Sequence, residues 1–195
     1  VREAFYIANE GRKGPVLIDI PKDITAAKCE FTPKQPQKPV NHNPEDIGER
    51  IAQAAELIKS SERPFIYAGG GVVSCSAEAE LTEFVKKLDA PISLSLMGQA
   101  AFNNKDPHFV GMLGMHGTKT AALSLKECDL MIVLGSRFSD RVALNTKTFA
   151  KHTKVLHVEI DPAEIGKNVA PDCYVNGDLK YVLAELNKAL AQESH

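Results

Sequence analysis

The stretch Leu130-Met-Ile-Val-Leu134, followed by Gly135-Ser-Arg-Phe-Ser-Asp-Arg-Val142, decides the fold class of this chain. Five consecutive apolar residues that end at a glycine are typical of a strand buried on both faces, as in a parallel sheet. The loop after this strand carries two arginines, whose guanidinium groups suit phosphate oxygens. A surface ion pair between Asp140 and either arginine is the alternative interpretation.

Strand and helix patterns alternate about five times around this segment. We expect further strands at residues 65–68, 92–95, 155–160 and 173–175, and helices at 44–58, 76–88, 118–126 and 178–190, with a helix start at 161–164 and a loop over 98–116. Such alternation predicts an α/β fold: a doubly wound, mostly parallel sheet with helices on both faces, as in Rossmann-like nucleotide-binding domains. Ligands of these folds bind at the carboxyl ends of the strands.

The chain divides near a segment that contains three prolines, residues 31–39. Proline cannot donate to a helix or a sheet ladder, so we expect an extended linker over residues 31–43. Before it, residues 1–9 have a helical pattern and residues 15–20 the pattern of a strand, and we assign 1–30 to the end of a preceding domain. Residues 44–192 form the central domain, which we expect to begin with Asn43 as a helix cap and Pro44 at the first helical position.

Three loops after strands could carry a ligand. The segment Gly69-Gly-Gly-Val-Val-Ser74 approaches the dinucleotide fingerprint G-x-G-x-x-G, whose backbone amides can approach a pyrophosphate; a tight turn without a ligand is the alternative interpretation. The acid about 20 residues further on, Asp89, belongs to a helix end, which argues against an ordinary NAD domain. Glu159, at the end of a strand, could accept hydrogen bonds from ribose or adenine, or simply be solvated. The Met-rich segment 111–117 suits a flat aromatic ring.

Composition excludes several classes of protein. The 195 residues are 44% hydrophobic and 25% charged, with a formal net charge of −2 and no basic stripe, so we expect no nucleic-acid partner. No apolar run approaches the ~18 residues of a membrane span, and no signal peptide is visible. The four cysteines form no C-x-x-C pair, and His116 has no metal-ligand spacing, so we expect no metal, reduced thiols and a cytoplasmic location. No cluster of residues resembles a self-sufficient catalytic centre.

Four segments together resemble one enzyme family. Residues 11–23 (GRKGPVLIDIPKD), 111–118 (GMLGMHGT), 128–142 (CDLMIVLGSRFSDRV) and 157–167 (HVEIDPAEIGK) are similar, in the same order, to the thiamin diphosphate-dependent enzymes, and most of all to acetolactate synthases. The resemblance implies that residues 1–30 end the pyrimidine-binding domain and that the central domain binds FAD, with a largely structural role. Thiamin diphosphate and Mg²⁺ would belong to domains of the parent enzyme that this chain lacks, so we expect no catalytic residue here.

The resemblance also implies a set of FAD-binding residues: Arg12, Gly69, Gly70, Gly71, Ser95, Leu96, Leu113, Gly114, Met115, His116, Gly135, Ser136, Arg137, Arg141, Val142, Glu159, Ile160, Gly177 and Asp178. The sequence departs from the family pattern at Lys13, where proline is common, at Ser139, where the family has an aspartate, and at Ala143-Leu144, where it has Thr-Gly.

The parent enzyme of this family decarboxylates pyruvate and joins the two-carbon unit to a second 2-keto acid, which begins branched-chain amino-acid synthesis. The resemblance implies that its partners are the flanking domains and further copies of the chain, and it leaves a regulatory small subunit open. Two alternatives remain: the central domain of pyruvate oxidase or glyoxylate carboligase, and a free-standing module that binds NAD or no nucleotide.

Overall fold

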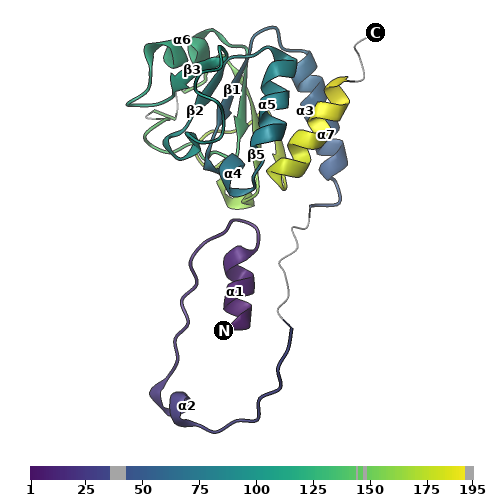
Figure 1. Cartoon of the computed structure of the whole chain (residues 1–195). Helices are drawn as coiled ribbons and strands as arrows, with labels where there is room; N and C mark the ends of the chain where they lie inside the picture. Colours follow the sequence, from purple (N-terminus) through teal and green to yellow (C-terminus); the bar gives the residue numbers. More distant parts are fainter. Residues whose placement is uncertain (36–42, 144, 147–148, 192–195) are drawn as a thin grey trace. The chain divides into compact units, whose positions relative to one another are not determined.

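The computed structural model of the protein describes residues 1–35, 43–143, 145–146 and 149–191. The chain forms two compact units, Val1–His42 and Asn43–His195 (Figure 1). The first unit contains the helices α1 (Arg2–Asn9) and α2 (Lys22–Ala26), and none of its described side chains is buried. Residues 31–35 have no regular structure, and the rest of the predicted linker up to residue 42 lies outside the described residues.

The strand predicted at residues 15–20 does not form. The segment has no regular secondary structure, and its apolar side chains are exposed, with Leu17 at 93%. A strand needs a neighbour to accept and donate its backbone hydrogen bonds, and no other strand lies in the described part of this unit. The prediction of a strand from the apolar pattern of residues 15–20 was therefore wrong for this chain.

The second unit is built on one parallel sheet. Its strands lie in the order β3-β2-β1-β4-β5-β6, and every neighbouring pair is parallel. Their bounds are β1 (Pro64–Ala68), β2 (Ile92–Leu94), β3 (Phe109–Met112), β4 (Leu130–Leu134), β5 (Lys154–Glu159) and β6 (Cys173–Asn176). The order reverses between β1 and β4, which confirms the predicted doubly wound α/β fold.

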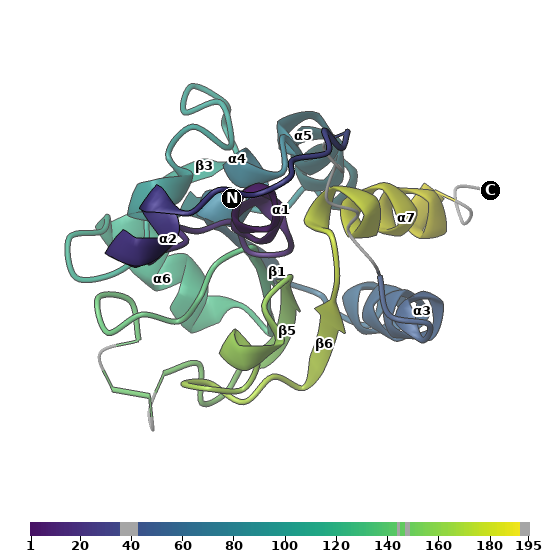
Figure 2. The ribbon, with the colours of Figure 1, turned by 90° about the horizontal axis from the view of Figure 1, so that it is seen from below.

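Helices cover both faces of the sheet. The helices α3 (Ile47–Lys59), α5 (Glu78–Leu88) and α7 (Leu179–Ala191) bury their apolar stripes in one core, against side chains such as Ile66, Leu134 and Val158 (Figure 1). Seen from below, α3 and α7 lie side by side (Figure 2). The opposite core is smaller, and α6 (Lys119–Glu127) and the loop after β4 cover it. All five residues of β4 are buried, as the continuous apolar run predicted.

One strand and three short helices were not predicted. The segment 98–116 contains the edge strand β3 inside the predicted loop, and its pairing with β2 is interrupted by a register shift. Its four residues include Gly111 at φ +102°, so neither length nor alternation gave a strand signal. The unpredicted helices are α2, α4 (Gly70–Ser74) and the 3-10 helix η1 (Leu96–Gly98), whereas the helix start predicted at 161–164 forms the 3-10 helix η2 (Pro162–Glu164).

The predicted cap of α3 was also wrong. This helix begins at Ile47, after Asp46, rather than at Pro44. The Oδ1 atom of Asn43 instead accepts a hydrogen bond, 3.1 Å long, from the backbone amide of Asp178, just before α7. A side chain 135 positions away in sequence thus satisfies a donor at the start of α7, and local pattern could not indicate this partner.

Candidate cofactor-binding site

All predicted site residues except Arg12 lie at the carboxyl edge of the sheet. They follow β1 (Gly69–Gly71), β2 (Ser95 and Leu96), β3 (residues 113–116), β4 (residues 135–142) and β6 (Gly177 and Asp178), while Glu159 is the last residue of β5 and Ile160 follows it. Because the six strands are parallel, these segments share one edge of the sheet. Arg12 belongs to the first compact unit.

The glycine segment after β1 packs directly on the segment after β4. The Gly71 amide donates to the Gly135 carbonyl, and the Gly69 amide to the Leu134 carbonyl, both at 2.9 Å. A Cβ atom on Gly69 would lie 2.4 Å from the Gly135 oxygen, which leaves no room for a side chain. Contact between two protein loops thus explains Gly69 and Gly71, and their amides are already used within the protein rather than presented to a pyrophosphate.

The loop after β4 is anchored by one buried ring and presents two exposed arginines. The ring of Phe138 packs edge-to-face on Phe149 and His157, with centroids 5.8 and 5.2 Å apart. Arg137 and Arg141 are exposed on either side of this anchor, and in the described part of the chain neither forms a salt bridge with Asp140. The loop therefore offers two fork-shaped donors to an anion.

The segment after β3 rests on this arginine loop. The amide of Met115 donates to the Arg141 carbonyl at 2.8 Å. Gly114 adopts φ +119°, and a Cβ atom there would lie 2.6 Å from the same carbonyl oxygen. Leu96 and Met115 remain exposed beside it, at 73% and 46%, and provide apolar surface at the same edge. The carboxyl edge thus combines cationic and apolar surface.

Glu159, at the end of β5, has a structural role that the sequence analysis did not predict. Its side chain is 8% exposed, and Oε1 accepts hydrogen bonds from the amides of Ile160 (3.0 Å) and Asp161 (3.3 Å). Asn176 fixes the same turn, because its Nδ2 donates to the carbonyls of Glu159 and Ile160. Asp178 caps α7 as predicted, through its Oδ1 and the Tyr181 amide at 3.0 Å.

Two buried polar residues behind the site were missed by the sequence analysis. Tyr67 on β1 is 1% exposed, and burial raises the pKa of its hydroxyl, while hydrogen bonds with Ser136 and Ser95 lower it. His157 on β5 is fully buried, and its Nε2 lies 3.1 Å from the Ser136 carbonyl oxygen. Burial lowers the pKa of this imidazole. The sequence did contain a signal for both residues, because each is a polar side chain within an otherwise apolar strand segment.

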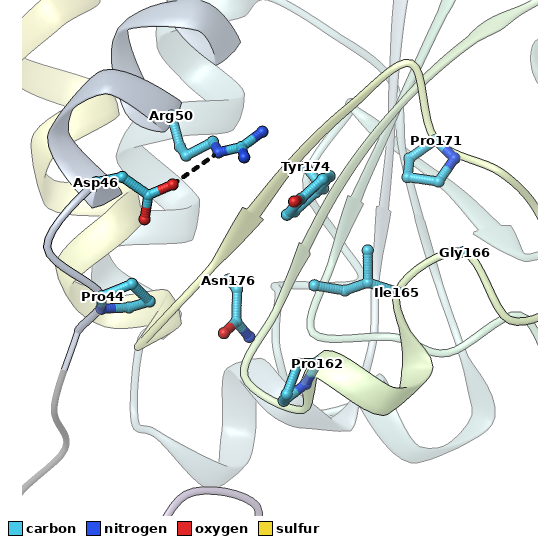
Figure 3. Close-up of a pocket in the computed structure, with 9 residues that line it drawn as sticks. All are labelled: Pro44, Asp46, Arg50, Pro162, Ile165, Gly166, Pro171, Tyr174 and Asn176. Atoms are coloured by element: carbon cyan, nitrogen blue, oxygen red, sulfur yellow. Dashed lines mark hydrogen bonds and ion pairs between the residues drawn. The ribbon is translucent and has the colours of Figure 1, made fainter.

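A cavity of about 500 Å³ lies at the β6 edge of the sheet, beside the beginning of α3 (Figure 3). In it, the Arg50 guanidinium is 4.4 Å from the centre of the Tyr174 ring, and its Nε is 3.1 Å from Asp46 Oδ2. None of the predicted site residues lines this cavity. Asn176 does line it, and the same side chain donates a hydrogen bond to the Glu159 carbonyl.

The described residues contain no candidate metal-ion cluster, membrane-spanning helix or disulfide. No group of three or more His, Cys, Asp or Glu side chains among them could hold a metal ion. Within the same residues, no helix has the length and apolar character to cross a membrane. The four cysteines form no disulfide, and burial raises the pKa of the Cys75 and Cys128 thiols to about 11, so both are protonated near neutral pH.

Comparisons with known proteins agree with this arrangement. Residues 51–186 match the family model of the thiamine pyrophosphate enzyme, central domain. Over 190 residues, 95% of the chain, it is 45% identical to the acetolactate synthase large subunit of Parasynechococcus marenigrum (strain WH8102), of which it covers 31%. It is 42% identical over 193 residues, also 95% of the chain, to the acetolactate synthase of Arthrospira platensis, of which it covers 33%.

A solved structure shares the fold. It is the X-ray structure of a protein from Mycobacterium smegmatis that is assigned to the thiamin diphosphate-dependent enzymes. The match has a TM-score of 0.82 at 25% identity, and covers 100% of this chain and 37% of the other. The chain thus spans about a third of the length of the curated relatives it matches.

Proposed function

Since the chain belongs to the thiamine pyrophosphate enzyme family, as its central domain, we propose that it is the FAD-binding middle domain of an acetolactate synthase large subunit. The observation that carries the proposal is the convergence at one sheet edge of two exposed arginines with exposed Leu96 and Met115. A flavin nucleotide needs both, because its diphosphate is anionic and its ring system is flat and apolar.

Each part of the proposed site has its own role. Arg137 and Arg141 would hold the diphosphate and ribityl chain, and residues 113–116 with Ser95 and Leu96 would lie along the flavin ring. The turns at Glu159–Ile160 and Gly177–Asp178 would enclose the adenosine. Gly69, Gly71 and Gly135 contribute by letting two loops approach each other, which sets the floor of the site. In this proposal FAD has a largely structural role, as the resemblance to the family implies.

The parent enzyme would decarboxylate pyruvate and join the two-carbon unit to a second 2-keto acid. Thiamin diphosphate and Mg²⁺ would be bound by the remaining two thirds of that protein, so this chain holds and orients FAD but carries out no step of the reaction. We assign residues 1–30 to the end of the pyrimidine-binding domain, 31–43 to a linker, and 44–192 to the central domain. Further copies of the chain, and in some enzymes a regulatory small subunit, would complete the assembly.

Titration with FAD, followed by flavin fluorescence, tests the proposal. Replacing Arg137 or Arg141 by alanine removes charge-assisted hydrogen bonds worth ~1.5–3 kcal/mol each, so we expect affinity to fall by about 10- to 100-fold. The matched control is Arg63→Ala, because Arg63 is also an exposed arginine but immediately precedes β1, at the opposite edge of the sheet. Its affinity should equal that of the wild type.

NAD provides the parallel titration. Preferential binding of NAD would contradict the flavin assignment and favour a nucleotide-binding module of another kind. Equal losses of FAD affinity in all three arginine variants would show that the two loop arginines have no special role.

A further inference from the structure

A row of polar side chains crosses the buried face of the sheet behind the proposed site. In the strand register, Tyr67 of β1 pairs with Ser93 of β2 and with Val133 of β4, and Val133 pairs with His157 of β5. Paired residues of neighbouring strands point to the same face, so all four belong to one row. Ser93, Val133 and His157 are fully buried, and Tyr67 is 1% exposed. Polar groups are costly at such positions unless they are bonded.

The polar members of this row bond segments that lead to the carboxyl edge. Ser93 Oγ donates to the Gly111 carbonyl of β3 at 2.7 Å. The side chains of Ser136 and Ser95 interact with the Tyr67 hydroxyl and lower its pKa, which burial raises. The Ser95 side chain in turn accepts from the Gly98 amide at 3.1 Å, so one tyrosine is connected to the turns after β2 and β4.

His157 secures the same loop from the next strand. Its Nε2 lies 3.1 Å from the Ser136 carbonyl oxygen, and because that oxygen can only accept, Nε2 carries the proton. The ring also packs edge-to-face on Phe138, two residues further along the loop. Nδ1 is buried without a partner among the described residues, which a neutral ring tolerates far better than a charged one. The charged group that acts on this ring is Glu164, which is paired with Lys167 at 2.9 Å.

Ser136 is therefore bonded through its carbonyl from β5, and its side chain interacts with the Tyr67 hydroxyl of β1. The next residue along the chain is Arg137, which is exposed and extends beyond this anchor. A binding group on a loop loses less conformational entropy on binding when its backbone is already fixed. An apolar residue such as Val133 fills the same row without any bond, so packing alone does not require tyrosine or histidine there.

We propose that Tyr67 and His157 are positioning residues, which hold the Gly135–Val142 loop from behind in its cofactor-binding conformation before the cofactor arrives. This inference rests on the proposed flavin function for its ligand. Its geometric content, a loop held by two buried side chains, is independent of that function.

The test uses the full-length parent protein with three substitutions. Tyr67→Phe removes the hydroxyl and His157→Phe removes the ring donor, while both keep an aromatic volume. His157→Gln is the rescue variant, because the Gln amide nitrogen can replace Nε2 as a donor to the Ser136 carbonyl. The control is Thr153→Val, which removes a half-buried hydroxyl that donates to the Cys128 carbonyl at 3.0 Å, immediately before β5 and thus at the opposite edge.

Two measurements are made on each variant: FAD affinity, and peptide-resolved hydrogen exchange of the flavin-free protein. We expect Tyr67→Phe and His157→Phe to bind FAD about tenfold more weakly, and to exchange amides in the peptide that covers residues 135–143 at least tenfold faster. His157→Gln should recover most of both properties, and Thr153→Val should match the wild type in this peptide. Exchange elsewhere in the sheet should change little.

The outcomes separate the two hypotheses. A wild type that binds no FAD contradicts the proposed function, whereas exchange in residues 135–143 still decides whether the two residues hold the loop. Wild-type FAD binding with unchanged affinity and exchange in both phenylalanine variants overturns the positioning role. Uniformly faster exchange over the whole unit also overturns it, because the two residues would then only stabilise the fold.

Discussion

Gly69 shows how closely the structure constrains single residues at the carboxyl edge. Its amide donates a hydrogen bond to the Leu134 carbonyl. A Cβ atom added to it would lie 2.4 Å from the Gly135 carbonyl oxygen and 2.5 Å from the Ser136 Cβ atom. Sequence reasoning assigned this glycine to a phosphate, whereas the structure shows that two protein segments need it in order to touch. At the residue scale, the site therefore depends on loop-to-loop packing as much as on ligand contacts.

We expect Gly69→Ala to lower the free energy of unfolding by ~1–3 kcal/mol, because the added methyl group forces the two loops apart. The matched control is Gly48→Ala on α3, where a Cβ atom would meet nothing within 4 Å. That substitution should raise the free energy of unfolding by ~0.5–1 kcal/mol, since alanine loses less entropy in a helix. Urea denaturation measures both changes. Similar stabilities of the two variants would contradict the packing argument.

At the scale of the elements, one histidine joins the end of α5 to the edge strand β3. His108 Nδ1 is 2.6 Å from Asp106 Oδ1, and its Nε2 is 2.8 Å from Asp89 Oδ1, beyond the end of α5. The hydrogen bonds with Asp106 and Asp89 raise the pKa of this imidazole. The four-residue strand β3 lies at one edge of the sheet, and a register shift interrupts its pairing with β2, so this clamp stabilises an irregular edge strand.

The clamp should make stability depend on pH. A raised pKa means that the folded state favours the protonated ring, so the contribution is complete below about pH 6.5 and decreases as pH rises through the folded-state pKa. We expect His108→Asn to cost most at pH 5.5–6 and least near pH 9, and less than about 1 kcal/mol in all, because water screens the pair. Urea denaturation across this range measures the difference. His152→Asn, an exposed histidine before β5, is the control, and an equal pH profile in both variants would contradict the clamp.

At the scale of the whole chain, every buried apolar side chain that the structure describes belongs to the second unit. Within the described residues, the first buried side chain is that of Ile47, and Phe5, Leu17, Ile24 and Phe31 of the first unit are exposed. A segment with this much exposed apolar surface is suited to pack against other parts of a longer protein. This agrees with the chain spanning about a third of its relatives.

Removal of residues 1–42 should therefore change the free energy of unfolding by no more than about 0.5 kcal/mol, the range for residues outside a core. Urea denaturation of residues 43–195 beside the full chain tests this, and binding of a hydrophobic dye should fall in the shorter protein. A loss of several kcal/mol would show that the first unit contributes to the stability of the second.

The sequence by itself determined the fold class and most of its elements. Apolar runs such as 130–134 are long enough to predict strands, helices between them require parallel pairing, and parallel pairing places all strand ends at one edge. These are properties of neighbouring residues along the chain. The likeness of four segments to one family followed from the same local information, and the family comparison confirmed it.

Tertiary structure alone decided what those residues touch. The strand pattern at 15–20 formed no strand because it lacks a neighbour, and Asn43 serves α7 rather than α3 because the fold brings distant positions together. In the same way, Tyr67 and His157 became polar supports of one loop only through the strand register across β1, β4 and β5. Hydrogen bonds and packing between distant segments depend on three-dimensional proximity, which local sequence patterns do not contain.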